Sequence, residues 1–296
     1  MTKSSAISNY LSLVKFSHTI FAMPFAVIGF FLGTTQHVAD LNSSPWYAGG
    51  EVKLLLVIFC MIFARSAAMA FNRWADHKFD NENIRTKVRE IPKGIISPNN
   101  ALFFVIINCI LFIVMTFFIN RICFYLSPIA LAVVLGYSYT KRFTPLCHLV
   151  LGLGLALAPI GAFLAVTGEF KLLPLLYSFV VLFWVSGFDI IYALQDEEFD
   201  RSQNLKSIPV LLGTKNALLF SSILHLIATS LVLYAGYTAG FHSWYWIGAA
   251  IFICLLIYQH TLVKPNDLSK VTLAFATTNG IASVVFACFF LLELFI

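Results

Sequence analysis

Charged residues are scarce in this chain. They make up 11% of its 296 residues, whereas about a quarter of the residues of a typical soluble domain are charged. Hydrophobic residues reach 59% and include 30 Phe. This composition excludes an ordinary soluble domain and indicates an integral membrane protein.

The sequence also lacks the motifs of several kinds of site. Its six cysteines are scattered, mostly within apolar runs, and form no CxxC pair. Neither a disulfide framework nor a cysteine-based metal cluster is therefore indicated. The seven histidines have no paired spacing, and we interpret them as packing or interface residues. The glycines are too irregularly spaced for a phosphate-binding loop.

Long apolar runs fill most of the chain. A helix needs about 20 apolar residues to cross a bilayer, and nine runs approach or exceed this length: 15–34, 53–71, 101–119, 122–139, 146–166, 171–194, 217–238, 243–262 and 271–296. The first run lacks a clear small-residue cleavage site, so we expect a retained helix rather than a signal peptide. The sequence therefore predicts an all-α membrane protein with nine transmembrane helices, forming a single domain over residues 1–296.

Basic residues are unevenly distributed around these runs. Most of the 19 Lys and Arg fall at the N-terminus or in the connections after the second, fourth, sixth and eighth runs. Cytoplasmic loops carry an excess of Lys and Arg. A cytoplasmic N-terminus is therefore predicted.

Acidic residues gather in two of the same connections, which membrane topology does not explain. Asn72, Asp76 and Asp80 stand at four-residue intervals after the second run, and Asp196 and Asp200 do so after the sixth. Residues four apart share one face of a helix. Each set is therefore expected to form a stripe of oxygen-bearing side chains, which we name the first patch (Asn72, Asp76, Asp80) and the second patch (Asp196, Asp200).

Carboxylates stacked in this way repel each other, so something cationic should offset them. Neighbouring Lys and Arg in solvated loops are the simpler explanation, but two matching patches favour a ligand. Oxygen ligands suit Mg²⁺, which usually completes its coordination shell with waters and substrate phosphates. The surrounding connections supply the basic residues that would clamp such an anion, namely Arg85, Lys87, Arg89, Lys93, Lys141, Arg142 and Lys206.

Four segments carry a resemblance to a known family: NRWADHKFD (72–80), RTKVREIPKG (85–94), GYSYTKRFTPL (136–146) and DIIYALQDEEFDRSQNLKSIPVLLG (189–213). In this order, and with nine apolar runs, the chain resembles the UbiA superfamily of intramembrane aromatic prenyltransferases. The closest resemblance is to bacterial 4-hydroxybenzoate polyprenyltransferases of quinone biosynthesis. One departure is visible, because many members have Asp directly after the first Asn, where Arg73 stands here.

The resemblance implies a helical bundle around a central cavity, in which Mg²⁺ links both patches to the diphosphate of a polyprenyl donor. The implied acceptor is an aromatic acid, and the implied location is the inner membrane with the site on its cytoplasmic side and no nucleic-acid partner. The resemblance implies metal binding for Asn72, Asp76, Asp80, Asp196 and Asp200, and catalysis for these four Asp and Arg142. It implies diphosphate binding for Arg89, Lys141, Arg142 and Lys206, and acceptor binding from the cavity side for Tyr139 and Tyr192.

Two ionisable residues stand inside apolar runs. Arg65 lies seven residues before Asn72, and Asp189 lies seven residues before Asp196, so each shares the face of its patch about two turns deeper. Such residues are costly in a membrane and usually functional. We expect both at the acceptor site, where Arg65 either binds the acceptor's carboxylate or pairs with Asp189. The ring proton lost on prenylation goes either to a carboxylate such as Asp189 or to the released diphosphate.

Other functions remain as alternatives. The acceptor could be a naphthoate or another menaquinone precursor, and a haem farnesyltransferase of the same superfamily would share both patches. A membrane transporter is a more distant alternative, since transporter sites usually lie near the bilayer midplane in broken helices. Here the acids gather at one membrane face beside basic residues.

Overall fold

The structure is a computed structural model that describes residues 6–14, 22–41 and 50–296, and these ranges contain helices but no β-strand. The helices are α1 (Ala6–Leu13), α2 (Met23–Leu41), α3 (Gly50–Ala75), α4 (His77–Glu82), α5 (Pro98–Ile119), α6 (Arg121–Thr140), α7 (Cys147–Thr167), α8 (Leu172–Ala193), α9 (Glu197–Ser202), α10 (Ile208–Ala239), α11 (Ser243–Leu262) and α12 (Asn279–Phe295). A 3-10 turn, Leu194–Asp196, joins α8 to α9, and a π-helical turn, Leu273–Thr278, leads into α12.

Every predicted apolar run overlaps one long helix. By length and composition, eight helical segments of the described chain could cross a membrane, and α2 adds a shorter apolar stretch, Met23–Thr35. Residues 15–21 of the first predicted run lie outside the described residues. The all-α membrane fold is thus confirmed, whereas the count of nine spans and the orientation of the N-terminus stay predictions.

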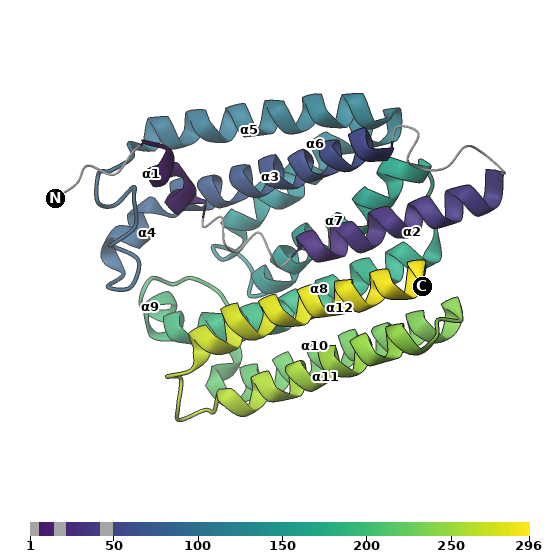
Figure 1. The fold of residues 1–296 in the computed structure, drawn as a ribbon. Helices are drawn as coiled ribbons and strands as arrows, with labels where there is room; N and C mark the ends of the chain where they lie inside the picture. The colour runs from purple at the N-terminus through teal and green to yellow at the C-terminus, as the bar shows by residue number, and fades with distance from the viewer. Residues whose placement is uncertain (1–5, 15–21, 42–49) are drawn as a thin grey trace.

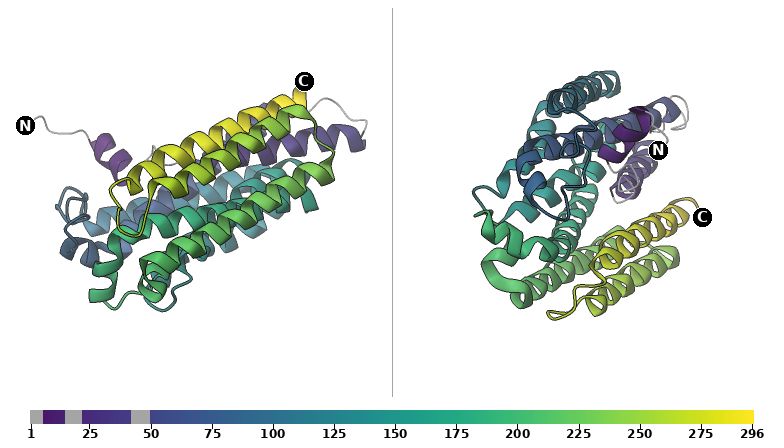
Figure 2. Two further views of the ribbon diagram at one scale, coloured as in Figure 1. Left: turned by 90° about the horizontal axis from the view of Figure 1, so that it is seen from below. Right: turned by 90° about the vertical axis from the view of Figure 1, so that its left-hand side faces the viewer.

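The long helices run roughly along one direction and form a bundle (Figures 1 and 2). The short helices α1, α4 and α9 lie together at one end of this bundle, on the left in Figure 1, while the C-terminus lies at the other end. The two patches flank α4 and α9. Both patches therefore lie at the same end of the molecule.

Helix α8 passes through the largest hydrophobic core cluster. Its Trp184 is fully buried, and the indole Nε1 donates a hydrogen bond to Asn279 Oδ1 of α12 at 3.0 Å. The Trp184 ring also lies 5.4 Å from the Phe25 ring and 5.7 Å from the Phe252 ring. Aromatic pairs at these separations stabilise a core beyond the area they bury. This core holds the end of α8, and with it the second patch, in a defined position.

Helices α7 and α8 approach closely at Gly152. A Cβ atom at this position would lie 2.4 Å from both the Leu182 carbonyl oxygen and Ser186 Oγ of α8. We expect Gly152→Ala to lower the free energy of unfolding by about 1–3 kcal/mol, the usual cost of overpacking a tight interior. Thermal unfolding in detergent measures this effect. Gly154→Ala is the matched control, because its Cβ would meet Val134 at an ordinary 3.6 Å, and equal destabilisation by both substitutions would contradict the argument.

Candidate active site

The first patch lies where α3 passes into α4. The backbone N–H of Asp76 donates to the Asn72 carbonyl at 3.0 Å, and that of Asp80 donates to the Asp76 carbonyl at 2.8 Å. The helical bonding thus continues through a bend at Asp76, whose φ and ψ are −100° and 8°. The Asn72 amide nitrogen also donates to Asp76 Oδ2 at 3.2 Å. The four-residue spacing therefore brings the first patch together, although α3 does not continue as one regular helix.

Asp196 of the second patch lies on the turn between α8 and α9, and Asp200 lies within α9. Asp196 accepts hydrogen bonds from Arg85 Nε at 3.0 Å and from the Asn83 amide at 3.2 Å, and it also forms an ion pair with Arg85 Nη2. Asp200 is buried, with 2% of its surface exposed, and accepts from Lys141 Nζ at 2.8 Å. Asn83 and Arg85 follow α4, so the loop after the first patch already binds the second.

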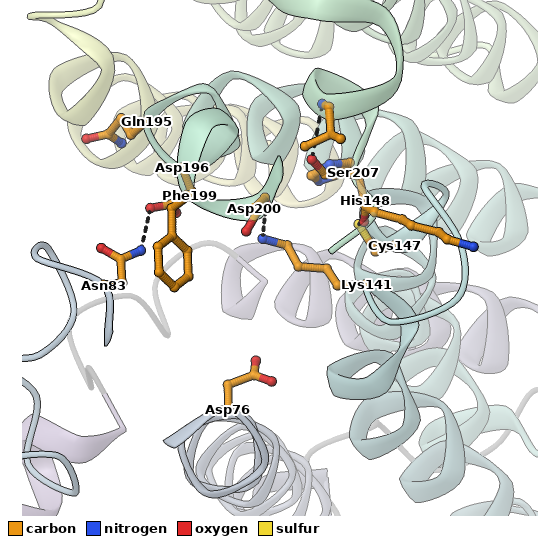
Figure 3. Close-up of polar contacts among 12 residues, drawn as sticks. Asp76, Asn83, Lys141, Cys147, His148, Gln195, Asp196, Phe199, Asp200 and Ser207 are labelled. Atoms are coloured by element: carbon orange, nitrogen blue, oxygen red, sulfur yellow. Dashed lines mark hydrogen bonds and ion pairs between the residues drawn. The ribbon is translucent and has the colours of Figure 1, made fainter. Parts of the chain in front are cut away.

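Two consecutive residues at the end of α6 contact both patches. Lys141 binds Asp200 of the second patch at 2.8 Å, while Arg142 Nη2 contacts Asp76 Oδ1 of the first at 3.3 Å. The same Arg142 nitrogen donates to the carbonyl of Ala75 at 2.8 Å, at the end of α3. Figure 3 shows Asp76 pointing across an open space toward Lys141 and Asp200. The two patches therefore face each other and belong to one site.

Each of the four Asp side chains has a cationic partner. Besides the pairs already described, Arg89 Nη1 lies 2.7 Å and 2.8 Å from the two carboxylate oxygens of Asp80. The residues expected to bind a diphosphate thus hold the carboxylates expected to bind metal. Lys206 differs, because its ammonium donates to the Phe143 carbonyl at 3.3 Å and its backbone N–H donates to the Lys141 carbonyl at 2.6 Å. Lys206 therefore fixes the loop that carries Lys141.

Burial and neighbouring charges shift the pKa values of these groups. Burial raises the pKa of the Asp76 carboxyl above its ordinary value, although the hydrogen bond from Arg142 opposes the shift. Burial acts to lower the pKa of Lys141, but the charge of Asp200 outweighs it and the net shift is upward. The pKa of Arg85 is likewise raised, because Asp196 outweighs the effect of burial. The basic side chains therefore stay charged at the site.

Tyr139 and Tyr192, which are predicted to take positions in the cavity, lie beside arginines of the patches. The Tyr139 ring lies 4.6 Å from the Arg142 guanidinium carbon, and the Tyr192 hydroxyl accepts from Arg85 Nη1 at 3.1 Å. Such placement over an aromatic face stabilises a cation by about 0.5–2 kcal/mol. Both tyrosines therefore position the arginines that bind the patches.

A cavity of about 350 Å³ lies among α3, α5, α6 and α7. Its wall is largely apolar, and Arg65 is the one charged residue among the described residues that line it. Arg65 Nε is buried and has no hydrogen-bond partner in the described chain. Tyr137 lines the cavity, whereas Tyr139 does not, because residues two apart point to nearly opposite sides of a helix. Tyr137 is a candidate site residue that sequence reasoning missed.

Asp189 has a different partner from the one expected. Its Oδ2 lies 2.6 Å from Nδ1 of His148 in α7, and the ion pairs of the described residues do not join it to Arg65. The alternative in which Arg65 pairs with Asp189 is therefore wrong for this structure. His148 and His225 are buried, as expected of packing residues, but each has an ionisable partner, and Nδ1 of His225 lies 2.8 Å from His260 Nε2. These partners come from different helices, so no local spacing in the sequence could reveal them.

Comparisons with known proteins identify the family of this chain. The model of the UbiA prenyltransferase family matches residues 20–291. A relative from Nitrosomonas eutropha, named 4-hydroxybenzoate octaprenyltransferase, is 30% identical over 79% of this chain and 82% of its own length.

Solved structures give the same result for the fold. The structure of a UbiA homologue from Aeropyrum pernix superposes with a TM-score of 0.82 at 30% identity, covering 93% of this chain and 98% of that one. A second UbiA homologue, from Archaeoglobus fulgidus and bound to DMAPP and Mg²⁺, has a TM-score of 0.73 at 23% identity and covers 97% and 99% of the two chains. The chain therefore belongs to the UbiA prenyltransferase family and is an integral membrane prenyltransferase.

Proposed function

We propose that the protein transfers a polyprenyl group from polyprenyl diphosphate to an aromatic acid such as 4-hydroxybenzoate, in quinone biosynthesis. The reaction takes place at the cytoplasmic side of the inner membrane and depends on Mg²⁺. The observation that carries this proposal is the contact of Lys141 with Asp200 and of Arg142 with Asp76, which joins two acidic patches into one site. The names of the curated relatives support the choice of acceptor.

The donor chemistry of the patches fits Mg²⁺. The two patches supply carboxylates and one amide, and hard divalent cations prefer such oxygen ligands. The residues that would hold the metal are Asn72, Asp76, Asp80, Asp196 and Asp200. When bound, Mg²⁺ supplies Lewis-acid stabilisation of the charge that develops on the leaving diphosphate. The related structure bound to DMAPP and Mg²⁺ supports this assignment.

The basic residues act on the same leaving group. Arg89, Lys141 and Arg142 each lie within 3.3 Å of a patch carboxylate, and so they stand where a diphosphate bound at the patches would contact them. Their positive charges stabilise the oxygen that takes up the electron pair as the allylic C–O bond breaks. Lys206 supports this set through the backbone of Lys141. The apolar cavity below the patches takes the hydrocarbon part of the substrates.

Arg65 is the residue that selects an acid as acceptor. Among the described residues that line the apolar cavity, Arg65 is the one that is charged. Its Nε has no hydrogen-bond partner in the described chain. A buried cation without a partner is costly, so a carboxylate that enters the cavity is bound strongly. Guanidinium and carboxylate groups pair in a bidentate geometry. This feature favours an aromatic acid, including a naphthoate, over an uncharged acceptor.

Mass spectrometry of reaction products tests the proposed function. The purified protein is incubated with Mg²⁺, a polyprenyl diphosphate and a panel of aromatic acids that includes 4-hydroxybenzoate and hydroxynaphthoates. We expect a product heavier by one prenyl group from 4-hydroxybenzoate. Prenylation of a hydroxynaphthoate alone would replace the proposed acceptor, and prenylation of none of the acids would overturn it.

We expect Arg65→Lys to raise the KM for the acceptor by about 10-fold or more, with a smaller change in kcat. Loss of one charge-assisted hydrogen bond costs about 1.5–3 kcal/mol, and 1.4 kcal/mol corresponds to tenfold. Initial rates over a range of acceptor concentrations measure the effect. The control replaces the acceptor by 4-hydroxybenzamide, which lacks the carboxylate and should be used equally poorly by both proteins. An unchanged KM for 4-hydroxybenzoate would exclude the carboxylate-binding role.

A further inference from the structure

A pair of ionisable side chains lies in the membrane part of the bundle and takes no part in binding metal or diphosphate. His148 of α7 and Asp189 of α8 are 2.6 Å apart between Nδ1 and Oδ2. An ionised carboxylate can only accept a hydrogen bond, so His148 Nδ1 donates. The His148 side chain is 1% exposed and that of Asp189 is 21% exposed. The His148 imidazole is therefore enclosed by the protein, whereas part of the Asp189 carboxylate can still be reached by a small molecule.

The packing of α7 on α8 fixes this pair. Ser186 of α8 donates a hydrogen bond to the His148 carbonyl at 3.1 Å, and Gly152, one turn beyond His148, lets the two helices approach closely. His148 donates to only one of the two carboxylate oxygens, and Oδ1 of Asp189 makes no hydrogen bond within the described chain. The pair is therefore held in one geometry with one oxygen available for a substrate.

Three helices place ionisable side chains in a layer below the patches. Arg65 lies seven residues from Asn72, Tyr137 four residues from Lys141, and Asp189 seven residues from Asp196. At 1.5 Å per residue these steps correspond to roughly 6–10 Å of depth. Arg65 and Tyr137 line the same cavity, and 21% of the Asp189 side chain stays exposed. An aromatic acid held by Arg65 has its ring in this layer.

We propose that Asp189 is the base that takes the proton from the acceptor ring, and that His148 is a positioning residue that holds the Asp189 carboxylate. This inference rests on the proposed function. As the donor's allylic C–O bond breaks, its electron pair leaves with the diphosphate, and a π pair of the ring forms the new C–C bond. The proton on that ring carbon then moves to Oδ1 of Asp189, and the C–H electron pair restores the aromatic ring.

The released diphosphate would lie further from the acceptor ring than Asp189 does. It leaves at the patches, where Arg89, Lys141 and Arg142 neutralise its charge and so weaken its affinity for a proton. Asp189 lies about two helical turns further into the bundle than the second patch. Its Oδ2 accepts one hydrogen bond, from His148 Nδ1. Among the ion pairs of the described residues, that of Asp189 is with His148 and involves no Lys or Arg.

An isotope experiment tests the role of Asp189. The acceptor is 4-hydroxybenzoate deuterated at both ring carbons adjacent to the hydroxyl-bearing carbon, used at saturating donor and Mg²⁺. In the wild-type protein we expect no primary isotope effect, because proton loss follows the slower bond-forming step. In Asp189→Asn we expect kcat to fall by about 100-fold or more, with little change in KM and a primary isotope effect. Asp267→Asn, at an exposed loop position, is the matched control and should behave as wild type.

The outcomes separate the two proposals. A wild-type protein that prenylates no aromatic acid overturns the proposed function and this inference together. A wild-type protein that forms product, with an Asp189→Asn variant that turns over normally or shows no isotope effect, overturns this inference alone. Donor binding by Asp189→Asn, measured without acceptor, should equal that of the wild type, because Asp189 does not contact the patches.

Two substitutions of His148 separate positioning from simple packing. His148→Ala removes the hydrogen-bond donor to Asp189. We expect a lower kcat and a primary isotope effect that is smaller than that of Asp189→Asn. His148→Asn places an amide donor near the position of Nδ1, and we expect it to restore most of the kcat and to remove the isotope effect. A purely structural histidine would lower stability in both variants without any isotope effect, and that result would refute the positioning role.

Discussion

Asp200→Asn is expected to lower the rate of prenyl transfer by about 1,000-fold. Asp200 is 2% exposed, lies within α9 and accepts a hydrogen bond from Lys141. The amide keeps the size of the side chain but removes the negative charge that a divalent cation requires. Charge stabilisation by a bound metal contributes several kcal/mol to such a transition state, and each 1.36 kcal/mol is tenfold in rate.

Initial rates at saturating donor, acceptor and Mg²⁺ measure this effect. Thermal unfolding of the same sample shows whether the variant is folded, since the substitution leaves Lys141 without its partner. Asp267→Asn is again the matched control, because it makes the same chemical change in an exposed loop. A folded Asp200→Asn protein whose rate stays within tenfold of the wild type would show that the second patch does not act on the leaving group.

The periodic features of the site could be predicted from the sequence. The four-residue spacing of Asn72, Asp76 and Asp80 predicted one stripe, and the backbone bonds across Asp76 preserve it even though the helix bends there. The nine apolar runs likewise correspond to long helices of the described chain. Both predictions depend on helical periodicity within one segment, which a sequence displays directly.

Contacts between helices could not be predicted in the same way. The partners of Asp189 and Asp196, namely His148 and Arg85, lie 41 and 111 positions away in the chain. Pairing at such separations depends on how the helices pack, and packing depends on details such as the close approach at Gly152. The choice between Tyr137 and Tyr139 also required the structure, because either tyrosine could face the bundle until the rotation of α6 was known.

The ion pairs at the patches explain how the site is stable before substrate arrives. Four carboxylates close together repel each other, and burial makes the repulsion costly. Each carboxylate is matched by its own Arg or Lys. Because these same cations also suit a diphosphate, under the proposed function they would exchange a carboxylate for the donor's diphosphate within the site. The site therefore needs no large rearrangement of the helices that carry it.

Chelating divalent metal is expected to abolish prenyl transfer without unfolding the protein. The rate should fall by about 1,000-fold or more in excess EDTA, because the metal's share of the charge stabilisation is lost, and it should return when Mg²⁺ is added in excess.

The fold should survive chelation, since Asp76, Asp80, Asp196 and Asp200 each keep a basic partner. A ligand that binds only the folded state at a concentration near its Kd stabilises it by less than about 1 kcal/mol. The temperature of unfolding should therefore shift by only a few degrees. These two measurements together separate a catalytic metal from a structural one, because loss of a structural metal unfolds the domain it holds. Full turnover in EDTA would disprove the metal-dependent mechanism, whereas unfolding in EDTA would show that the ion pairs alone do not hold the patches together.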